Sequence, residues 1–299
     1  MVRAAGAASP AMALVFVGSE AVAAGRVTKY DLRARHVRLF PDVYAPRDAR
    51  LTVFDRTVAA WLWSRRRGVV AGLAASALHG SKWVDDDVLI ELVLPNARAP
   101  RGIRTHDDEL CLGESQTLRG LRVTTPARTA FDVGRRLPGG SAVEALDALG
   151  NATGLTAPAV TAVADQHPGA RNVRKLKSAL AFYDAGAQSP KETWLRLVVV
   201  QDGYPPPQTQ LPIHCGGPYP RYYLDMAWPE MMIALEYDGA HHHKDPEQIR
   251  HDIERSEKLA EMGWIVIRVV AGMRPAEILY RVGRAWQRRD CSESENLAS

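Results

Sequence analysis

The sequence predicts an α/β protein whose C-terminal part holds a mixed β-sheet flanked by helices. Two apolar runs, "YYLDMAW" and "MMIALEYD", are separated only by Pro229 and Glu230, which favours an antiparallel hairpin. A helical segment from Pro246 and a buried strand, "WIVIRVV", follow. Strand, helix and strand in this order form a right-handed crossover, so the last strand should lie parallel to the second strand of the hairpin.

Length and composition indicate an ordinary globular protein. A chain of 299 residues with 46% hydrophobic and 24% charged residues can bury a core and form two domains. Cys111, Cys215 and Cys291 lie far apart, which argues against a disulfide framework or a cysteine-based zinc site and favours a reducing cytosol. The apolar "AMALVFVG" is shorter than a membrane span. We therefore expect a cytoplasmic protein with no membrane partner, and the net charge of +4 permits a polyanionic one.

The sequence pattern changes near residue 186, where the turn-forming run "DAGAQSP" follows a helical segment and marks a boundary. The predicted regions are therefore 1–50, 51–186 and 187–290, followed by a disordered tail over 291–299. In the second region "GLAASALHG" has helical spacing, "VLIELVLP" indicates a buried strand, and "TPARTAFDVGRRL" predicts a helix with Thr125 as N-cap and Pro126 in its first position.

Residues 18–47 predict a small winged helix-turn-helix. The expected order is a short helix, a turn at Gly25, a second helix capped by Thr28, and two short strands. Basic residues crowd the end of the second helix and the wing, where DNA-binding versions touch phosphates; those chosen as DNA contacts are Arg33, Arg35 and Arg38. The alternative is a solvated basic face on a packing domain.

Three acids are expected on one face of the C-terminal sheet. With a two-residue loop, Asp225 opposes Ala234 and becomes a diagonal neighbour of Glu236, and Asp238 shares their face because side chains alternate along a strand. Crowded carboxylates need a proton, a basic partner or a metal ion. Mg²⁺ (or Mn²⁺) suits carboxylate oxygens and phosphodiester cleavage. The alternative is a solvated strand end beside a turn.

Other residues near this face have competing interpretations. Glu192 follows Ser189 and Pro190 as the third residue of a predicted helix, so a capping box explains it without any catalytic role. The histidines 241–243 could supply a general acid or base, a zinc site or an exposed turn.

The helix after the histidines should begin at Pro246, capped by Asp245, and end at Gly263. Its expected apolar face consists of Ile249, Ile253 and Leu259 or Ala260.

These C-terminal motifs resemble a known family. "SPKE", "YYLDMAWPE", "ALEYDGAHHH" and "RHDIERSEKLAEMGWIVIRV" are similar, in this order over residues 187–270, to the very short patch repair endonuclease, a branch of the PD-(D/E)xK nuclease superfamily. The resemblance implies a restriction-endonuclease-like core in which Asp225 is the principal metal ligand, Glu192 comes from the preceding helix and a histidine after the second strand assists proton transfer. Glu236 and Asp238 stand where the superfamily has its (D/E)-x-K pair, and from the shared face all three acids, Asp225, Glu236 and Asp238, are the predicted metal ligands.

This sequence differs from the superfamily pattern at one position of the motif. Asp238 stands where the superfamily has its lysine, so His242, Arg255 or Lys258 would have to take the lysine's role in activating water. The choice of His242 follows the family's spacing, and Arg255 is also a candidate DNA contact.

The N-terminal half resembles the abortive-infection type IV antitoxin proteins through "LFPDVYAP", "GLAASALHG" and "LRVTTPARTAFDV". This resemblance implies that the winged helix binds operator DNA. Two hypotheses follow: a metal-dependent DNA endonuclease of nicking or repair type, or an antitoxin-like DNA-binding transcriptional regulator with an inactive nuclease fold.

Overall fold

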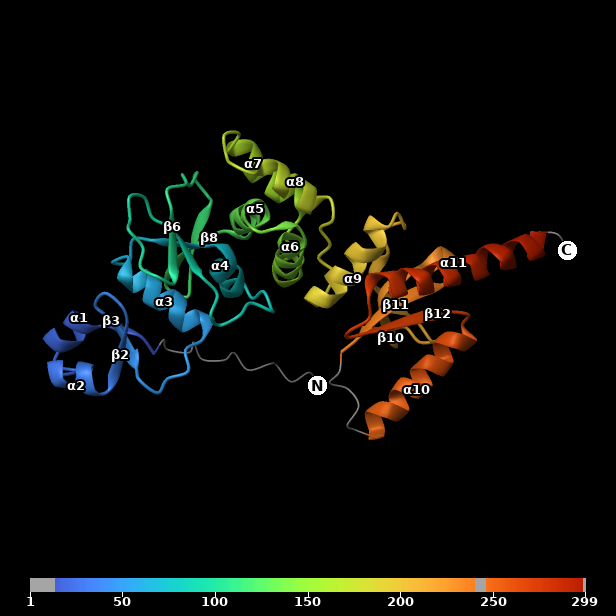
Figure 1. Ribbon diagram of the computed structural model, residues 1–299, viewed down its shortest axis with the longest axis horizontal. Coiled ribbons are helices and arrows are strands. Elements are labelled where there is room, and N and C mark those ends of the chain that lie inside the picture. Colours follow the sequence, from blue (N-terminus) through green and yellow to red (C-terminus); the bar gives the residue numbers. More distant parts are fainter. Residues whose placement is uncertain (1–13, 240–245, 298–299) are drawn as a thin grey trace. The chain divides into compact units, whose positions relative to one another are not determined.

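The computed structural model describes residues 14–239 and 246–297 (Figure 1). The chain divides into two compact units, Met1–Tyr183 and Asp184–Ser299. The boundary between them lies close to the one expected near residue 186. In both units mixed β-sheets are flanked by helices, so the predicted α/β class is confirmed. The histidines 241–243 and Asp245 lie outside the described residues.

The first unit begins with the elements expected for a winged helix-turn-helix. Their bounds are β1 Phe16–Val17, α1 Gly18–Ala23, α2 Lys29–Ala34, β2 His36–Phe40 and β3 Val43–Pro46. Gly25 adopts a left-handed φ of 66° between the helices, and Thr28 caps α2 in a reciprocal capping box with Asp31. The strands form a sheet in the order β1-β3-β2, and α3, Val53–Trp63, packs against it through Ala59. The predicted local order is confirmed, with β1 as an addition.

A five-stranded mixed sheet in the order β6-β5-β4-β8-β7 forms the centre of the first unit. Its strands are β4 Val69–Ala71, β5 Ile90–Val93, β6 Ile103–His106, β7 Ser115–Leu118 and β8 Leu121–Thr124. Ala60 of α3 and Ala74 of α4, Gly72–Leu78, pack into its core beside Leu92 and Val123. The buried strand expected from "VLIELVLP" is β5.

Four helices complete the first unit: α5 Pro126–Arg136, α6 Gly139–Thr153, α7 Ala157–Gln166 and α8 Val173–Leu180. The predicted start of α5, with Thr125 before Pro126, is confirmed, although the Thr125 side chain makes no capping hydrogen bond. Buried charged side chains lie along α5, of which Arg128 is 1% exposed and Asp132 is fully buried.

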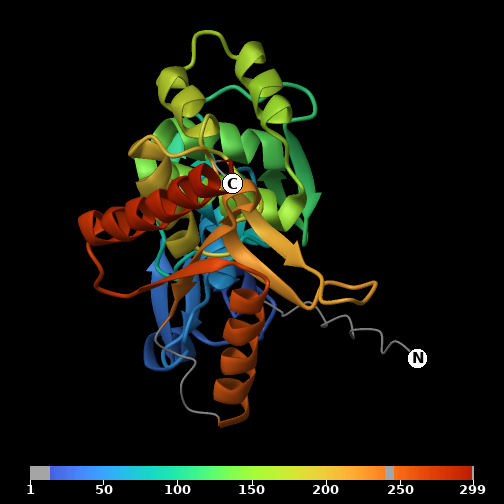
Figure 2. The same ribbon diagram turned by 90° about the vertical axis from the view of Figure 1, so that its right-hand side faces the viewer.

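The second unit is a four-stranded sheet in the order β12-β11-β10-β9. Its elements are α9 Pro190–Gln201, β9 Gln208–Ile213, β10 Tyr222–Trp228, the 3-10 turn η1 Pro229–Met231, β11 Ile233–Asp238, α10 Pro246–Glu261, β12 Ile265–Val270 and α11 Pro275–Leu297. β11 and β12 are parallel, as predicted. Leu195 of α9 and Ile278 of α11 pack with Leu235 on one face, while Leu259 of α10 packs with Ala234 on the other. Figure 2 shows the ribbons of α11 and α10 on opposite sides of this sheet.

The hairpin register differs from the prediction. Ala227 pairs with Ala234 and Met226 with Leu235, so the strands are displaced by two residues from the register in which Asp225 opposes Ala234. The reason is a longer loop, because η1 adds a turn and Met232 adopts a left-handed φ of 49°. An even displacement preserves the face of every side chain, and the observed register, continued by one residue, sets Asp225 across from Glu236 rather than diagonal to it.

Two further expectations are wrong. Ile249 and Ile253 of α10 are 42% and 53% exposed, and Ala260 is exposed, so of the expected apolar face only Leu259 is buried. Helix α11 continues to Leu297, through most of the segment predicted as a disordered tail, because neither glycine nor proline interrupts the chain after Gly283. Among the described residues, none of the helices is both long enough and apolar enough to span a membrane.

Candidate acidic active site

The acids on β10 and β11 share one small pocket. Its volume is about 220 Å³, and its lining residues are Asp225, Glu236, Tyr237, Asp238, Asp252, Arg255 and Arg268. The structure therefore brings together four of the residues selected from the sequence, namely Asp225, Glu236, Asp238 and Arg255. It also explains the inward face of α10, since Asp252 and Arg255 point into this pocket where an apolar stripe was expected.

Asp225 is the electrostatically unusual member of the pocket. Burial raises the pKa of its carboxyl from the ordinary 3.8 to about 7, and the negative charges of Glu192 and Glu236 add to the rise. The backbone N–H of Tyr237 donates a hydrogen bond of 3.1 Å to Asp225 Oδ2, and this bond, with the charge of Arg255, lowers the pKa only in part. At neutral pH this carboxyl therefore lies close to its point of half-protonation.

Glu236 is only 7% exposed, but it has a cationic partner. Arg255 from α10 holds it with both terminal nitrogens, Nη1 donating to Oε2 at 2.9 Å and Nη2 donating to Oε1. The same Nη2 donates to the carbonyl of Tyr223 at 2.9 Å. Arg255 is thus fixed inside the site by hydrogen bonds to Glu236, whereas its charge acts on Asp225 without a hydrogen bond between the two described side chains.

Glu192 lies at the start of α9, 8% exposed. Its backbone N–H donates to Ser189 Oγ at 3.2 Å, and its side chain accepts from Ser189 Oγ at 2.8 Å and from the backbone N–H of Gln188 at 2.9 Å. The predicted capping box thus forms with Gln188, one residue earlier than the N-cap, as the backbone donor. Capping and proximity to Asp225 coexist, since the charge of Glu192 still raises the Asp225 pKa.

Lys258 is not brought to the acids. Its side chain is 47% exposed and pairs with Glu261 one turn along α10, with Nζ and Oε2 2.9 Å apart. Helical geometry explains this, because Lys258 lies six positions after Asp252 and is therefore turned about 120° away from it around the helix, and the buried residue in that turn is Leu259. His242 lies outside the described residues.

Sequence reasoning missed two members of the pocket, Asp252 and Arg268. Arg268 pairs with Glu236 in the parallel register of β11 and β12, and its Nη2 donates to Ser256 Oγ at 2.5 Å. The sequence "IVIRVV" could have indicated Arg268. Side chains alternate along a strand, so the arginine between the apolar Ile267 and Val269 lies on the sheet face opposite to theirs. Asp252 precedes Arg255 by three residues and shares its side of the helix.

The pocket fits a hard divalent cation in part. Carboxylate oxygens are the donors that Mg²⁺ prefers, usually one or two of them together with water and phosphate oxygens. Within the described part of the chain, the acids do not form a set of three with donor atoms all within 4.8 Å of one another; Cys111, Glu114 and His167 do. The three-carboxylate ligand set predicted from the sequence is therefore more open than expected.

The predicted DNA contacts of the N-terminal region lie in the first unit, whereas the acids lie in the second. Arg33, Arg35 and Arg38 are all exposed, at the end of α2 and along β2. Arg35 has one acidic neighbour, Asp31, with Nε and Oδ1 3.8 Å apart. The guanidinium groups are therefore accessible from solvent.

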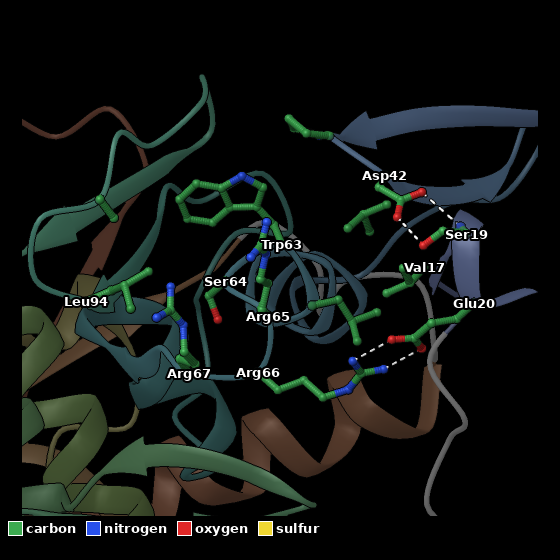
Figure 3. Close-up of a pocket in the computed structure, with 14 residues that line it drawn as sticks. Val17, Ser19, Glu20, Asp42, Trp63, Ser64, Arg65, Arg66, Arg67 and Leu94 are labelled. Atoms are coloured by element: carbon green, nitrogen blue, oxygen red, sulfur yellow. Dashed lines mark hydrogen bonds and ion pairs between the residues drawn. The ribbon is translucent and has the colours of Figure 1, made fainter.

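In a larger pocket of the first unit, of about 820 Å³, both lining acids have hydrogen-bond partners (Figure 3). Arg66 holds Glu20 through two contacts of 2.7 Å, and Asp42 accepts from the backbone N–H of Ser19 at 2.9 Å and from its hydroxyl at 2.5 Å. Its acids are therefore satisfied, in contrast to Asp225.

Comparison with known proteins gives relatives but no described activity. No family model matches the chain. Uncharacterized protein MT2308 of Mycobacterium tuberculosis strain CDC 1551 and uncharacterized protein Rv2248 of strain H37Rv are each 30% identical to it over 252 residues, covering 83% of this chain and 91% of the relative. The chain belongs to the family of these two mycobacterial proteins. Because 252 residues exceed the length of either unit, the MT2308 and Rv2248 similarity extends across both.

Proposed function

We propose that the second unit is a metal-dependent DNA endonuclease of nicking or repair type, which hydrolyses phosphodiester bonds at the acidic pocket. The observation that carries this proposal is Asp225: a partly buried carboxyl with a pKa of about 7, placed beside Glu192 and Glu236 and hydrogen-bonded to a backbone N–H instead of a side-chain cation. Keeping such a group lowers the stability of the protein, and binding of a divalent cation would offset that cost.

Asp225 and Glu236 would hold Mg²⁺ or Mn²⁺, with Asp238 at the same pocket. When bound, the cation would supply positive charge to the scissile phosphate and lower the pKa of a coordinated water. A restriction-endonuclease-like arrangement of β10, β11 and α9 is part of this proposal.

The arginines of the pocket would not activate water, although the sequence made Arg255 a candidate for that role. An arginine keeps its proton at all physiological pH values, so neither Arg255 nor Arg268 can accept a proton from water. Their role would be to offset the charge of the acids and of a bound phosphate. Proton transfer would then fall to a carboxylate or to one of the histidines 241–243.

The test is cleavage of supercoiled, mismatched and single-stranded DNA in the presence of Mg²⁺ or Mn²⁺. Asp225→Asn should slow single-turnover cleavage at least about 100-fold, because even residues that only support a metal ligand contribute about 10–100-fold. Asp202→Asn is the matched control, since Asp202 is an exposed acid at the end of α9 outside the pocket. Absence of cleavage on every substrate, or equal cleavage by both variants, would contradict the proposal.

A second candidate is an antitoxin-like DNA-binding transcriptional regulator whose nuclease fold is inactive. It is favoured by the three exposed arginines of α2 and β2 and by Asp238 in the position of the superfamily lysine. Replacing Arg33, Arg35 and Arg38 by Gln should weaken binding to the DNA upstream of its own gene. It should also reduce the salt dependence of binding by about one unit of slope for each phosphate that the variant no longer touches.

The matched control for this second candidate removes the same charge elsewhere, by replacing the exposed Arg171, Arg174 and Lys175 by Gln. Specific binding that survives Asp225→Asn, without cleavage, would favour the regulator over the enzyme. An equal loss of affinity in both triple variants would contradict a DNA contact at the winged helix.

A further inference from the structure

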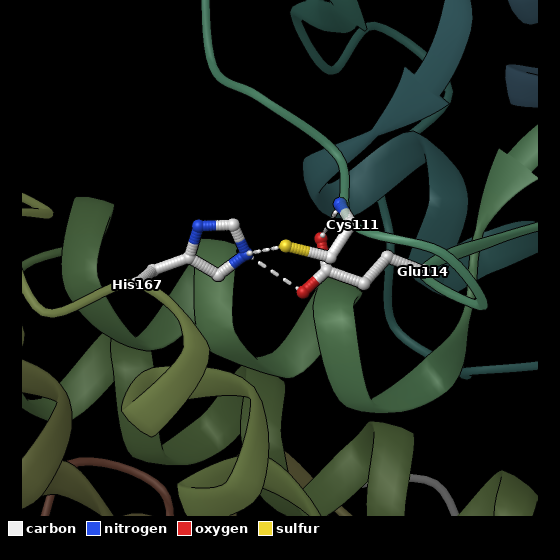
Figure 4. Close-up of side chains that lie close together, drawn as sticks. All are labelled: Cys111, Glu114 and His167. Carbon is white, nitrogen blue, oxygen red and sulfur yellow. Dashed lines mark hydrogen bonds and ion pairs between the residues drawn. The ribbon is translucent and has the colours of Figure 1, made fainter.

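Cys111, Glu114 and His167 form a compact cluster of metal-ligating side chains in the first unit (Figure 4). Cys111 and Glu114 come from the segment between β6 and β7, and His167 is the C-cap of α7. The His167 Nε2 lies 2.7 Å from Glu114 Oε1 and 3.8 Å from Cys111 Sγ, and all three donor atoms lie within 4.8 Å of one another. We propose that these three residues bind a zinc ion.

The turn that carries Cys111 and Glu114 orients their donor atoms. The Glu114 N–H donates to the Cys111 carbonyl at 3.1 Å, and the Cys111 N–H donates back to Glu114 Oε2 at 3.0 Å. Gly113 supplies the left-handed φ of 85° that the turn requires. Because Oε2 is engaged within the turn, Oε1 is the oxygen left facing His167.

Arg128, which is 1% exposed, holds the Glu114 carboxylate through its other oxygen, Oε2. Its Nη1 lies 2.5 Å from Glu114 Oε2, 2.8 Å from the Glu109 carbonyl and 3.2 Å from His167 Nε2. This nitrogen carries only two protons, and the two nearer oxygens use both. His167 Nε2 is therefore left to share a proton with Glu114 Oε1, or to bind a cation in place of that proton.

The spacing of the donor atoms is close to that of a zinc site. Tetrahedral zinc with the usual bond lengths separates a sulfur and a nitrogen ligand by about 3.6 Å, and a nitrogen and an oxygen ligand by about 3.4 Å. The contact of 3.8 Å between Cys111 Sγ and His167 Nε2 already agrees with this geometry. The contact of 2.7 Å between His167 Nε2 and Glu114 Oε1 is that of a hydrogen bond and would open by a fraction of an ångström as the metal displaces the proton.

The local charges also balance around a divalent ion. A Cys111 thiolate and the Glu114 carboxylate together cancel two positive charges. Arg128 keeps a second partner in Asp132, with Nε and Oδ2 3.1 Å apart. Asp132 also pairs with Arg135 and Arg136, but these two arginines have Asp108 and Glu91 as further partners, so the three arginines remain offset by three acids when Glu114 binds the metal. Sulfur and imidazole ligands select zinc over magnesium, and three protein ligands leave one coordination position for water or another small ligand.

The spacing of the cysteines argues against a cysteine-based zinc site, so this proposal departs from what the sequence predicts. Only Cys111 contributes a thiol, and His167 is 53 residues away from Glu114 in sequence, so spacing gave no signal. An occupied site would link the turn of residues 111–114 to the end of α7.

The experiment uses the full chain, freed of metal by a chelator and titrated with Co²⁺ as the probe and then with Zn²⁺. We expect the Co²⁺ bound at Cys111, Glu114 and His167 to give the visible absorption of a four-coordinate ion and a thiolate-to-cobalt charge-transfer band, both of which disappear when Zn²⁺ displaces it. Cys111→Ser should abolish the charge-transfer band and weaken Zn²⁺ binding at least about 100-fold. His167→Gln should weaken Zn²⁺ binding to a similar degree.

The other cysteines provide matched controls, since Cys215→Ser and Cys291→Ser should keep the band unchanged. Asp225→Asn should keep it as well, which separates this site from the acidic pocket of the second unit. Circular dichroism of each metal-free variant establishes that it is folded, and Zn²⁺ should raise the melting temperature of the parent but not of Cys111→Ser. The absence of a thiolate band in the folded parent, or its persistence in Cys111→Ser, would overturn the proposal and leave the cluster as an ion-pair network.

Discussion

The two units handle buried acids in opposite ways. In the first unit, burial acts to raise the pKa of Glu91, but a hydrogen bond from His106 and the charge of Arg136 outweigh it and hold the pKa below its usual value. In the second unit, burial acts on Asp225 in the same direction, and the neighbouring acids reinforce it. The comparison shows that the partners of a buried carboxyl, more than its burial, decide whether it stays charged.

The same contrast exists inside the acidic pocket. Glu236 is held by both terminal nitrogens of Arg255, whereas among the described residues Asp225, across the hairpin, accepts a hydrogen bond from the backbone N–H of Tyr237 and none from a side-chain cation. A buried acid without a cation is destabilising, so its retention points to a ligand that supplies the missing charge.

The largest effect on stability is expected in the first unit, where the buried Arg128 pairs with two buried acids. Arg128→Met should destabilise the first unit by about 3–5 kcal/mol, because it leaves Glu114 buried without its arginine and removes one of the three arginines that pair with Asp132. Denaturant unfolding of the full chain measures this. The control is Arg122→Met, which removes an exposed arginine of β8; equal stability of the two variants would mean that the network contributes little.

A smaller loss is expected at the acidic pocket. Arg255→Met should lower the unfolding free energy of the second unit by about 1–3 kcal/mol, since Glu236 loses a charged hydrogen-bond partner. It should also raise the pKa of Asp225 further, because the charge of Arg255 lowers that pKa. An unchanged Asp225 pKa in this variant would contradict the proposed coupling within the pocket.

Asp225→Asn should stabilise the metal-free protein at alkaline pH. The folded pKa of about 7 lies above the unfolded value of 3.8, so the folded state binds the extra proton and stability falls as the pH rises between these values. Above pH 7 the parent no longer has this contribution, and the variant should be more stable by about 1–3 kcal/mol. Unfolding curves at pH 5 and pH 8 measure the difference, which should be greater at pH 8; a constant difference would count against a raised pKa.

The smallest effect is expected at Lys258. Lys258→Ala removes an exposed pair with Glu261 on the surface of α10, so neither the melting temperature nor any cleavage rate should change measurably. The variant serves as the surface counterpart of Arg255→Met on the same helix. A loss of activity in Lys258→Ala would show that the lysine reaches the site during the reaction.

Local chemistry allows much of this structure to be predicted from sequence. Thr28 with Asp31, and Pro126 after Thr125, mark helix starts through backbone geometry that depends on neighbours in the chain. Alternation along a strand places the acids on a common face, and the crossover rule gives the direction of β12.

The errors arise where distant contacts decide the outcome. Nothing in "WPEMM" signals a left-handed Met232, so the sequence predicts a loop that is too short. The inward face of α10 is polar because it covers acids, and a search for apolar periodicity therefore favours Ile249 and Ile253, which are exposed. The pairing of His167 with Glu114 depends on the packing of α7 and has no sequence signature.

The central claim is that, among the described residues, no side-chain cation is hydrogen-bonded to Asp225, and that a divalent metal supplies the missing positive charge. Its most direct test is a pH titration of the Asp225 carboxyl carbon by NMR, assigned by comparison with Asp225→Asn and recorded with and without Mg²⁺. We predict a midpoint near 7 in the metal-free protein and a clear downward displacement when Mg²⁺ is added. A midpoint near the ordinary 3.8, or one near 7 that Mg²⁺ leaves unchanged, would contradict the account.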